Sequence, residues 1–467
     1  MADEFDVIVI GAGPPGENAA GRVADGGLSC AIVEERLVGG ECSFFGCVPS
    51  KTLIRPGDVI AAARRAPGAA EAITGSIDVA AALAQRDYMT SDLSDRTQTP
   101  WLDSEGIELF RGHGRLAGER SVGVEMADGS GVQRLIARRA VVMSVGSTAL
   151  IPPIEGLGDA SPWTNVEATA VKEIPRRFLV LGGGAVGIEL AQAFRRLGSE
   201  EVTVVEGGPR LLVREEPFAG DEVAKSFETE GITVIIGAKM IGVRRAAPDR
   251  PVTGVLEDGR QIEADEILVA VGRRPRTGDV GLDTVGLGDL AGRYLEVDEL
   301  LHVRGSEWLY SVGDCNGLAL LTHMGKYQGR ICGDVILGKD AKDVADHGII
   351  PRVTFTEPEV GSVGLTEAGA GEEGHDVVTS LVRFEDNERA HLEGHTFGIV
   401  KLVADRSTGE LLGGHVVGEG AGEMIHQVVV AMAGRIPPGV VADTIHAYPT
   451  LSESVRSAFI ELAGKLA

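Results

Sequence analysis

Residues 5–16 read Phe5-Asp-Val-Ile-Val-Ile10 and then Gly11-Ala-Gly13-Pro-Pro-Gly16, and this stretch decides the fold. The apolar run predicts a buried strand, and residues 17–24 have the pattern of a helix. A second apolar strand, residues 30–33, ends on Glu34 and Glu35. Glycines let the backbone approach a pyrophosphate, a helix N-terminus offers unpaired N–H groups, and an acid about 20 residues further on accepts ribose hydroxyls. We therefore predict a dinucleotide-binding unit with ligand contacts at Gly11, Gly13, Gly16 and Glu34.

The same arrangement recurs later in the chain. The apolar run 178–181 leads into Gly182-Gly-Gly184-Ala-Val-Gly187, a helix is expected over 188–196, and the strand 202–205 ends on Glu206. The chain has 65 glycines, so one chance match would be unremarkable, but two complete units 171 residues apart are not. Two dinucleotide sites in one chain indicate internal electron transfer. The second site is predicted to use Gly182, Gly184, Gly187 and Glu206.

Three more apolar runs each end at a glycine turn, where an α/β sheet places ligand contacts. They run through residues 140–146, 265–272 and 309–313, and they make Gly146, Gly272 and Asp314 candidate cofactor contacts. Beyond Pro351 the pattern changes to strand-like runs at 398–403 and 411–417, followed by a helix at 421–432. This last part is expected to form a separate α+β domain.

Composition excludes several classes of protein. The net charge of −25 and the lack of a basic cluster argue against a nucleic-acid partner. Five irregularly spaced cysteines in 467 residues do not make a secreted disulfide framework, so we expect a reducing compartment. The acidic start of the chain is unlike a signal peptide, and no stretch approaches the roughly 18 apolar residues of a membrane span. These features predict a cytoplasmic protein without a membrane partner.

Two cysteines stand in a distinctive setting, Gly39-Gly-Glu-Cys42-Ser-Phe-Phe-Gly-Cys47-Val-Pro-Ser-Lys51. A pair five residues apart, directly after a dinucleotide unit, suits a reversible disulfide better than two buried thiols. Zinc is a weaker interpretation because no second Cys or His pair stands at ligand spacing, and no metal site is expected. The remaining cysteines, Cys30, Cys315 and Cys332, are interpreted as packing residues.

This cysteine segment resembles the redox-active motif of the class I pyridine nucleotide-disulfide oxidoreductases, the group of dihydrolipoamide dehydrogenase, glutathione reductase and mercuric reductase. The resemblance extends over nearly the whole chain, including the Gly313-Asp314 turn, residues 355–366 and residues 448–453. It implies an α/β fold with two Rossmann-like dinucleotide-binding domains and a C-terminal α+β dimerisation domain. The implied boundaries are residues 1–150 with 276–348 for FAD, 151–275 for NAD, and 349–467 for the dimer contact.

The resemblance also implies roles for individual residues. FAD would occupy the first unit, with Glu34 on the adenosine ribose and Asp314 on the ribityl chain, and a nicotinamide nucleotide would occupy the second. Cys47 would face the flavin and Cys42 the substrate. Lys51 and Glu189 resemble the family's ion pair beside the flavin N5. The last domain would form a homodimer and carry Tyr448 and Glu453 to the partner's flavin.

Glu206 bears on the choice of nicotinamide nucleotide. An acid at this position accepts both ribose hydroxyls and repels a 2′-phosphate, so NADH is favoured. Arg210 and Arg214 follow closely and would soften that preference, which keeps NADPH as the minority interpretation.

The chain departs from the family at the catalytic base. Members that act on disulfides have a His where this chain has Tyr448, and a Tyr, with an ordinary pKa of about 10 against about 6.5 for His, is a poor base at neutral pH. His446 is two residues away but matches a family position that is not the base. Mercuric reductase also has Tyr there but needs a C-terminal cysteine pair, and Cys332 is the last cysteine here.

A second departure lies between the two cysteines. Phe44 and Phe45 replace smaller family residues and either wall off the disulfide or pack in the core.

We therefore hypothesise an FAD-dependent NADH oxidoreductase that passes electrons through the flavin and the Cys42/Cys47 pair to a small acceptor such as a quinone. The alternatives are a dihydrolipoamide dehydrogenase-type disulfide oxidoreductase and a redox-sensing flavoprotein with little turnover.

Overall fold

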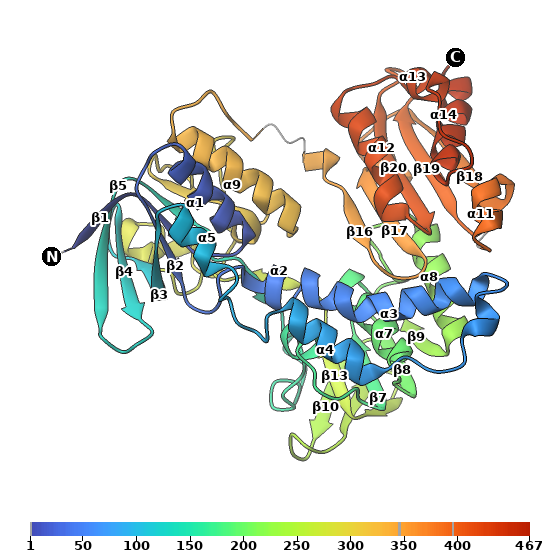
Figure 1. Cartoon of the computed structure of the whole chain (residues 1–467), viewed down its shortest axis with the longest axis horizontal. Coiled ribbons are helices and arrows are strands. Elements are labelled where there is room, and N and C mark those ends of the chain that lie inside the picture. Colours follow the sequence, from blue (N-terminus) through green and yellow to red (C-terminus); the bar gives the residue numbers. More distant parts are fainter. Residues whose placement is uncertain (1, 344–346, 395–396) are drawn as a thin grey trace. The chain divides into compact units, whose positions relative to one another are not determined.

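The computed structural model describes residues 2–343, 347–394 and 397–467 (Figure 1). The chain forms two compact units. The first is built from residues 2–49, 85–150 and 272–343. The second contains residues 50–84, 151–271 and the described residues from 347 onward. Helix α3 (Cys47–Arg65) begins in the first unit and continues into the second.

The first unit has a six-stranded sheet in the order β1-β2-β3-β4-β5-β15, with β1 also pairing with β5. Strands β1 and β2 run parallel, as a βαβ unit requires, and β3, β4 and β5 form an antiparallel meander. Helix α1 (Pro14–Asp25) lies against α9 (Thr322–Ile336) so closely that a Cβ on Gly329 would meet the Pro15 carbonyl oxygen at 2.3 Å (Figure 1). The strands are β1 (Asp3–Ile10), β2 (Cys30–Glu34), β3 (Ile107–Leu116), β4 (Ser121–Met126), β5 (Val132–Met143) and β15 (Leu309–Ser311).

Shorter elements of this unit carry candidate site residues. Helix α2 (Gly40–Phe44) contains Cys42, and strands β6 (Ser147–Ala149) and β14 (Arg273–Pro275) pair with each other. Helix α5 (Thr99–Ser104) packs beside β3, and α4 (Val79–Met89) connects the two units along the chain.

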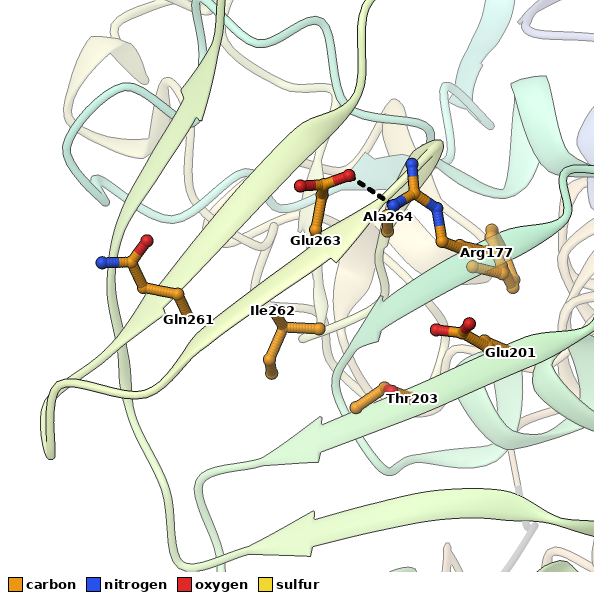
Figure 2. A pocket seen from close by; sticks show the side chains of 8 residues that line it. Arg177, Glu201, Thr203, Gln261, Ile262, Glu263 and Ala264 are labelled. Carbon is orange, nitrogen blue, oxygen red and sulfur yellow. Dashed lines mark hydrogen bonds and ion pairs between the residues drawn. The ribbon is translucent and has the colours of Figure 1, made fainter.

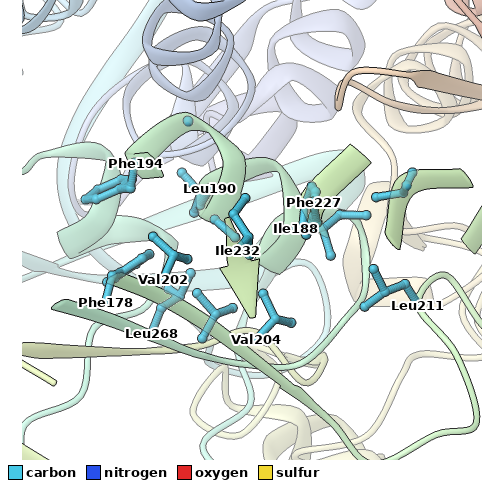
Figure 3. Close-up of a cluster of buried hydrophobic side chains, with 14 of the residues drawn as sticks. Phe178, Ile188, Leu190, Phe194, Val202, Val204, Leu211, Phe227, Ile232 and Leu268 are labelled. Atoms are coloured by element: carbon cyan, nitrogen blue, oxygen red, sulfur yellow. The ribbon is translucent and has the colours of Figure 1, made fainter. Parts of the chain in front are cut away.

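The second unit begins with a four-stranded parallel sheet in the order β13-β7-β8-β9. Its core is apolar and aromatic, with the Phe178 and Phe194 rings stacked at 4.6 Å between centroids (Figure 3). Ile54 of α3 belongs to the same cluster, which anchors that helix on this unit. The elements are β7 (Arg177–Leu181), α7 (Ala185–Arg196), β8 (Glu201–Glu206), α8 (Pro217–Glu230), β9 (Ile232–Ile236) and β13 (Glu266–Val269), with a three-stranded sheet of β10 (Met240–Arg245), β11 (Val252–Leu256) and β12 (Gln261–Ala264).

The C-terminal part of the second unit is a five-stranded antiparallel sheet in the order β16-β17-β20-β19-β18. Helices α12 and α14 pack on it and bury apolar residues such as Ile425, Val428 and Phe459. The strands are β16 (Arg352–Thr354), β17 (Glu359–Gly364), β18 (Val377–Arg383), β19 (Ile399–Asp405) and β20 (Leu411–Gly418). The helices are α10 (Glu367–Glu372), α11 (Glu388–Leu392), α12 (Ala421–Ala433), α13 (Pro438–Asp443) and α14 (Ser452–Leu466).

The expected fold class is therefore confirmed: both predicted βαβ units form, and an α+β sheet follows them. None of the helices in the described part of the chain combines the length and apolar character needed to cross a bilayer.

Candidate functional site

The first glycine loop joins β1 to α1. A Cβ on Gly11 would meet the Ser144 carbonyl oxygen at 2.2 Å, and one on Gly16 would meet the Gly11 carbonyl oxygen at 2.0 Å, so these two positions must be glycine. Around Gly13 the nearest neighbour of a Cβ is Pro15 Cδ at 3.8 Å. The middle glycine therefore faces open space at the N-terminus of α1, where backbone N–H groups can receive a pyrophosphate.

The second glycine loop, between β7 and α7, has the same design. A Cβ on Gly182 would lie 2.5 Å from the Ala270 carbonyl oxygen, and one on Gly187 would lie 2.1 Å from the Gly182 carbonyl oxygen. No atom lies within 4 Å of the Cβ position of Gly184. Both loops therefore have packed outer glycines and an open middle glycine, which fits two dinucleotides.

An acid stands at the same place beside each loop. Glu34 at the end of β2 accepts hydrogen bonds from the backbone N–H groups of Ala12 at 2.8 Å and Arg36 at 2.7 Å. Glu206 at the end of β8 accepts from Gly183 N–H at 2.6 Å and Gly208 N–H at 2.5 Å. These bonds fix each carboxylate next to its loop, where remaining lone pairs can accept ribose hydroxyls.

The two candidate redox cysteines lie at neighbouring helix ends. Cys42 is in α2, and Cys47 is the first residue of α3, exposed, with its Sγ 3.5 Å from Thr322 Oγ1. A hydrogen bond with Cys47, followed by burial, raises the pKa of the Cys42 thiol. The two sulfurs are therefore close enough to interact. Phe44 and Phe45 are buried, as core packing requires.

A charged network next to Cys42 was not predicted from the sequence. Arg273 donates from Nη2 to Glu41 at 2.6 Å and from Nε to Ser147 Oγ at 2.6 Å, and Ser147 donates to Asp314 at 2.5 Å. Burial raises the pKa of Asp314, against the opposing effect of Ser147 and Arg273. Asp314 thus lies in a polar cluster beside the first loop's sheet. The sequence predicted Asp314 from the Gly313-Asp314 turn, whereas the only signal for Arg273 was that it directly follows Gly272.

Gly146 and Gly272 flank this network in turns with φ of +70° and +148°. Both have left-handed backbone, which favours glycine.

Lys51 and Glu189 meet in the second unit. Lys51 Nζ lies 2.7 Å from Glu189 Oε2, and the other oxygen of the buried Glu189 accepts from Phe355 N–H at 2.9 Å. Lys51 also lies over the Phe355 ring, 4.7 Å from its centroid. Both carboxylate oxygens of Glu189 are therefore engaged, which holds the lysine in one place.

The C-terminal candidates lie in the segment before and at the start of α14. Tyr448 is 71% exposed, and its side chain has no hydrogen-bond partner in the described ranges. Glu453 Oε2 accepts from Thr450 N–H at 3.3 Å. His446 contacts the Thr444 carbonyl oxygen and Gln427, as a local turn residue would. Tyr448 and Glu453 thus form no hydrogen-bonded pair within this chain.

Figure 2 shows a pocket of about 360 Å³ that takes no part in this arrangement. It lies at the first residues of β7 and β8, Arg177 and Glu201, with Arg177 paired to Glu263 (Figure 2). Nucleotides bind at the carboxyl ends of parallel strands, so this pocket is at the opposite edge of the sheet. None of the predicted site residues lines it. No group of three or more metal-ligating side chains occurs among residues 2–343, 347–394 and 397–467.

This chain is similar to known proteins over nearly its whole length. Residues 5–329 match the family described as pyridine nucleotide-disulphide oxidoreductase, and residues 350–459 match its dimerisation domain. The dihydrolipoyl dehydrogenase of Mycobacterium tuberculosis is 32% identical over 465 residues, 99% of each chain. The mercuric reductase of Lysinibacillus sphaericus is 31% identical over 98% of this chain and 82% of its own. The crystal structure of LpdA from Mycobacterium tuberculosis is similar with a TM-score of 0.87 at 28% identity, covering 99% of this chain and 100% of that one.

Proposed function

This chain belongs to the pyridine nucleotide-disulphide oxidoreductase family, and from that premise we propose that it oxidises NADH with FAD as cofactor and reduces a small acceptor, a quinone. The family is one of flavoprotein oxidoreductases that use FAD and NAD(P)H. The balanced reaction takes a hydride from NADH and a proton from water, and it gives NAD⁺ and a quinol.

We assign the two glycine loops to the two cofactors. Gly11, Gly13, Gly16, Glu34, Gly146 and Asp314 would hold FAD within a domain of residues 1–150 and 276–348. Gly182, Gly184, Gly187, Glu206 and Gly272 would hold the nicotinamide nucleotide within residues 151–275. When bound, FAD supplies two-electron chemistry between the nicotinamide and the Cys42/Cys47 pair. Lys51, held by Glu189, would place a positive charge next to the reacting ring.

Glu206 supports NADH as the electron donor. Its carboxylate is fixed by two backbone N–H groups at the place where the ribose would lie. The guanidinium of Arg210 is already engaged, because it donates to the carbonyl oxygens of Leu212 at 3.1 Å and Glu215 at 2.8 Å. These donors are therefore not available to bind a phosphate. A 2′-phosphate would therefore meet the Glu206 carboxylate without compensation from Arg210, which leaves the exposed Arg214 as the base that would soften the preference.

The observation that carries the quinone proposal is the setting of Tyr448. Exchange between a dithiol and a disulfide needs a side chain that takes up and returns the thiol proton. Position 448 carries a Tyr in place of the His that would do this, and Tyr448 makes no hydrogen bond to Glu453. A quinone needs no such base because it takes protons from water after electron transfer. The acceptor that this site suits is therefore one whose reduction needs no side-chain acid or base at the position of Tyr448.

We also propose a homodimer formed through residues 349–467 and working in the cytoplasm, where thiols stay reduced. Apolar side chains in the chain segment that precedes Tyr448 are exposed in the single chain: Val430 is 62%, Val440 55% and Ile445 96% exposed. Exposed apolar side chains of this kind are typical of a protein interface. We infer that a second copy buries them and that Tyr448 lies at the same contact.

A steady-state acceptor panel tests the proposal. The purified holoenzyme is given NADH or NADPH with lipoamide, glutathione disulfide, a naphthoquinone or oxygen. We expect NADH with the quinone to give the highest kcat/KM. Lipoamide reduction at about 10⁴ M⁻¹s⁻¹ or more, the range of efficient enzymes, would overturn the proposal.

One observation favours a second candidate, a dihydrolipoamide dehydrogenase-type reaction. Cys42 and Cys47 interact with each other, which would suit a reversible disulfide whose Cys42 undergoes thiol–disulfide exchange with a substrate. The same panel separates the two candidates, since only this one gives lipoamide as the preferred acceptor.

A further inference from the structure

A large pocket lies within the second unit, away from that unit's own glycine loop. Its volume is about 760 Å³, in the range of small-molecule sites. The last turns of α3, the C-terminal end of α7, α8 and the start of β17 surround it. Helix α7 rises about 16 Å from its first to its last residue, so a pocket at Arg196 is that far from the nucleotide loop at the other end. The pocket is therefore separate from the proposed nucleotide site.

The pocket is lined by both apolar and charged side chains. Ile60, Ala61, Ile77 and Pro358 supply apolar surface. The charged lining residues are five bases, Arg64, Arg65, Arg196, Lys225 and Arg383, and three acids, Glu222, Glu230 and Glu357. An excess of positive charge in one pocket is unusual in a chain with a net charge of −25. This combination matches a ligand that has an apolar body and an anionic group.

One wall is held in place by ion pairs. Glu357 pairs with Arg65 and, at 2.6 Å, with Arg196, which also pairs with Glu230 at 2.7 Å. The Glu357 backbone is fixed as well, because its carbonyl oxygen accepts from Gln192 at 3.0 Å and Ser226 at 2.6 Å. These contacts form the pocket before any ligand arrives, which reduces the entropy that binding must overcome.

Two of the bases are not neutralised. Arg64 and Arg383 are solvent-exposed, and their guanidinium groups have no ion-pair partner in the part of the chain that the structure describes. Nε of Arg65 is buried and lacks a hydrogen-bond acceptor among the same residues. Lys225 is paired with Glu222 at 2.9 Å and contributes less charge. The unpaired positive charge therefore lies with Arg64 on α3 and with Arg383 at the end of β18.

We propose that this pocket binds a small organic anion, with one carboxylate, sulfonate or phosphate between Arg64 and Arg383 and a compact apolar body over Ile60 and Ala61. This inference is independent of the acceptor and of the nicotinamide preference.

The test uses 8-anilinonaphthalene-1-sulfonate as the probe, titrated into the holoenzyme with saturating NAD⁺ so that the nucleotide site is blocked. Fluorescence and calorimetry should report one saturable site per chain. An exposed ion pair contributes a factor of up to about five in affinity, so the double variant Arg64→Gln/Arg383→Gln should bind the probe roughly 10-fold more weakly. The Arg64→Lys/Arg383→Lys variant should bind within about two-fold of the native chain, because it keeps both charges.

Two controls distinguish binding in this pocket from two other effects: a change in the net charge of the protein, and adsorption of the probe to any apolar surface. Arg176→Gln/Arg260→Gln removes the same net charge from exposed residues outside the pocket and should leave affinity unchanged. The uncharged analogue N-phenyl-1-naphthylamine should bind at least 10-fold more weakly than the sulfonate, since it lacks the anion. Equal binding of the two probes, equal losses in both Gln double variants, or no saturable site would each overturn the proposal.

Discussion

Nζ of Lys51 lies 2.7 Å from Oε2 of Glu189 and joins α3 to α7. Glu189 is buried and 138 residues away along the chain. Its second oxygen accepts from Phe355 N–H, so one carboxylate connects three segments of the second unit. A buried carboxylate with two charge-assisted partners holds a lysine in a fixed position far better than a surface pair does.

Glu189→Gln should slow NADH-dependent quinone reduction roughly 10- to 100-fold, the kinetic equivalent of losing a charge-assisted hydrogen bond of about 1.5–3 kcal/mol. The amide oxygen can still accept from Phe355 N–H, so the fold should be retained. Stopped-flow measurement of flavin bleaching by NADH reports the step directly. The exposed Glu228→Gln on α8 is the matched control, and an equal loss in both variants would refute a role for the ion pair.

Cys42→Ser should halve the NADH consumed in an anaerobic titration of the oxidised enzyme. Under the proposed reaction the native chain would present a flavin and a Cys42/Cys47 disulfide to reduce, each with two electrons, whereas the variant would present only the flavin. Thiol titration after denaturation should show two new thiols in the native chain and none in the variant. Cys30→Ala, at a buried cysteine outside the pair, should behave as the native chain does. Equal NADH uptake in native and Cys42→Ser protein would exclude the disulfide from the reaction.

Glu206→Gln should raise the ratio of NADPH to NADH kcat/KM by about 10-fold, since it removes the charge that repels a 2′-phosphate and weakens the bonds to the ribose. Steady-state kinetics with both nucleotides gives the ratio. Arg210→Gln should change it little because that guanidinium is occupied by backbone carbonyls. A large drop in NADPH use by Arg210→Gln would show that the arginine, not the acid, sets the preference.

Tyr448→His should gain lipoamide activity by about 100-fold, the lower range for a positioned general base, with quinone reduction unchanged. Tyr448→Phe serves as the control and should gain nothing. Lipoamide and quinone reduction are measured side by side on the same preparations. If the His variant stays inactive with lipoamide, the missing base is not what limits that reaction.

Glu17→Gln should make the protein more stable at alkaline pH. Burial raises the pKa of Glu17 to about 7, with Lys326 opposing and Glu34 adding to the shift. A folded-state pKa above the unfolded value means that ionisation opposes folding, so stability falls as pH rises from about 4.5 to about 7 and stays low above that. The variant removes this cost, about 3 kcal/mol at pH 8.5 and less than 1 kcal/mol at pH 5. Denaturant melts at both pH values check it, and an equal gain at both would contradict the ionisation argument.

Local pattern was enough to predict the dinucleotide units. The two glycine loops, the acids Glu34 and Glu206 and the Cys42/Cys47 segment are defined by spacing within about 25 residues, and backbone geometry at such short range permits few alternatives. The same applies to the strands, since an apolar run of four or five residues between glycine turns fits a buried parallel strand.

Contacts between residues that lie far apart in the sequence became known only from the tertiary structure. Arg273 reaches Glu41 across 232 residues, and Arg64 and Arg383 line one pocket from a helix and a strand with no common motif. Resemblance to relatives pointed to Lys51 and Glu189, but only the tertiary structure brings Lys51 of α3 and Phe355 to Glu189 of α7. Local periodicity and glycine conformation were therefore enough to specify the fold class and the two glycine loops. Which side chains meet was determined by the order of strands in the sheets and the packing of helices against them, and no local pattern encodes that.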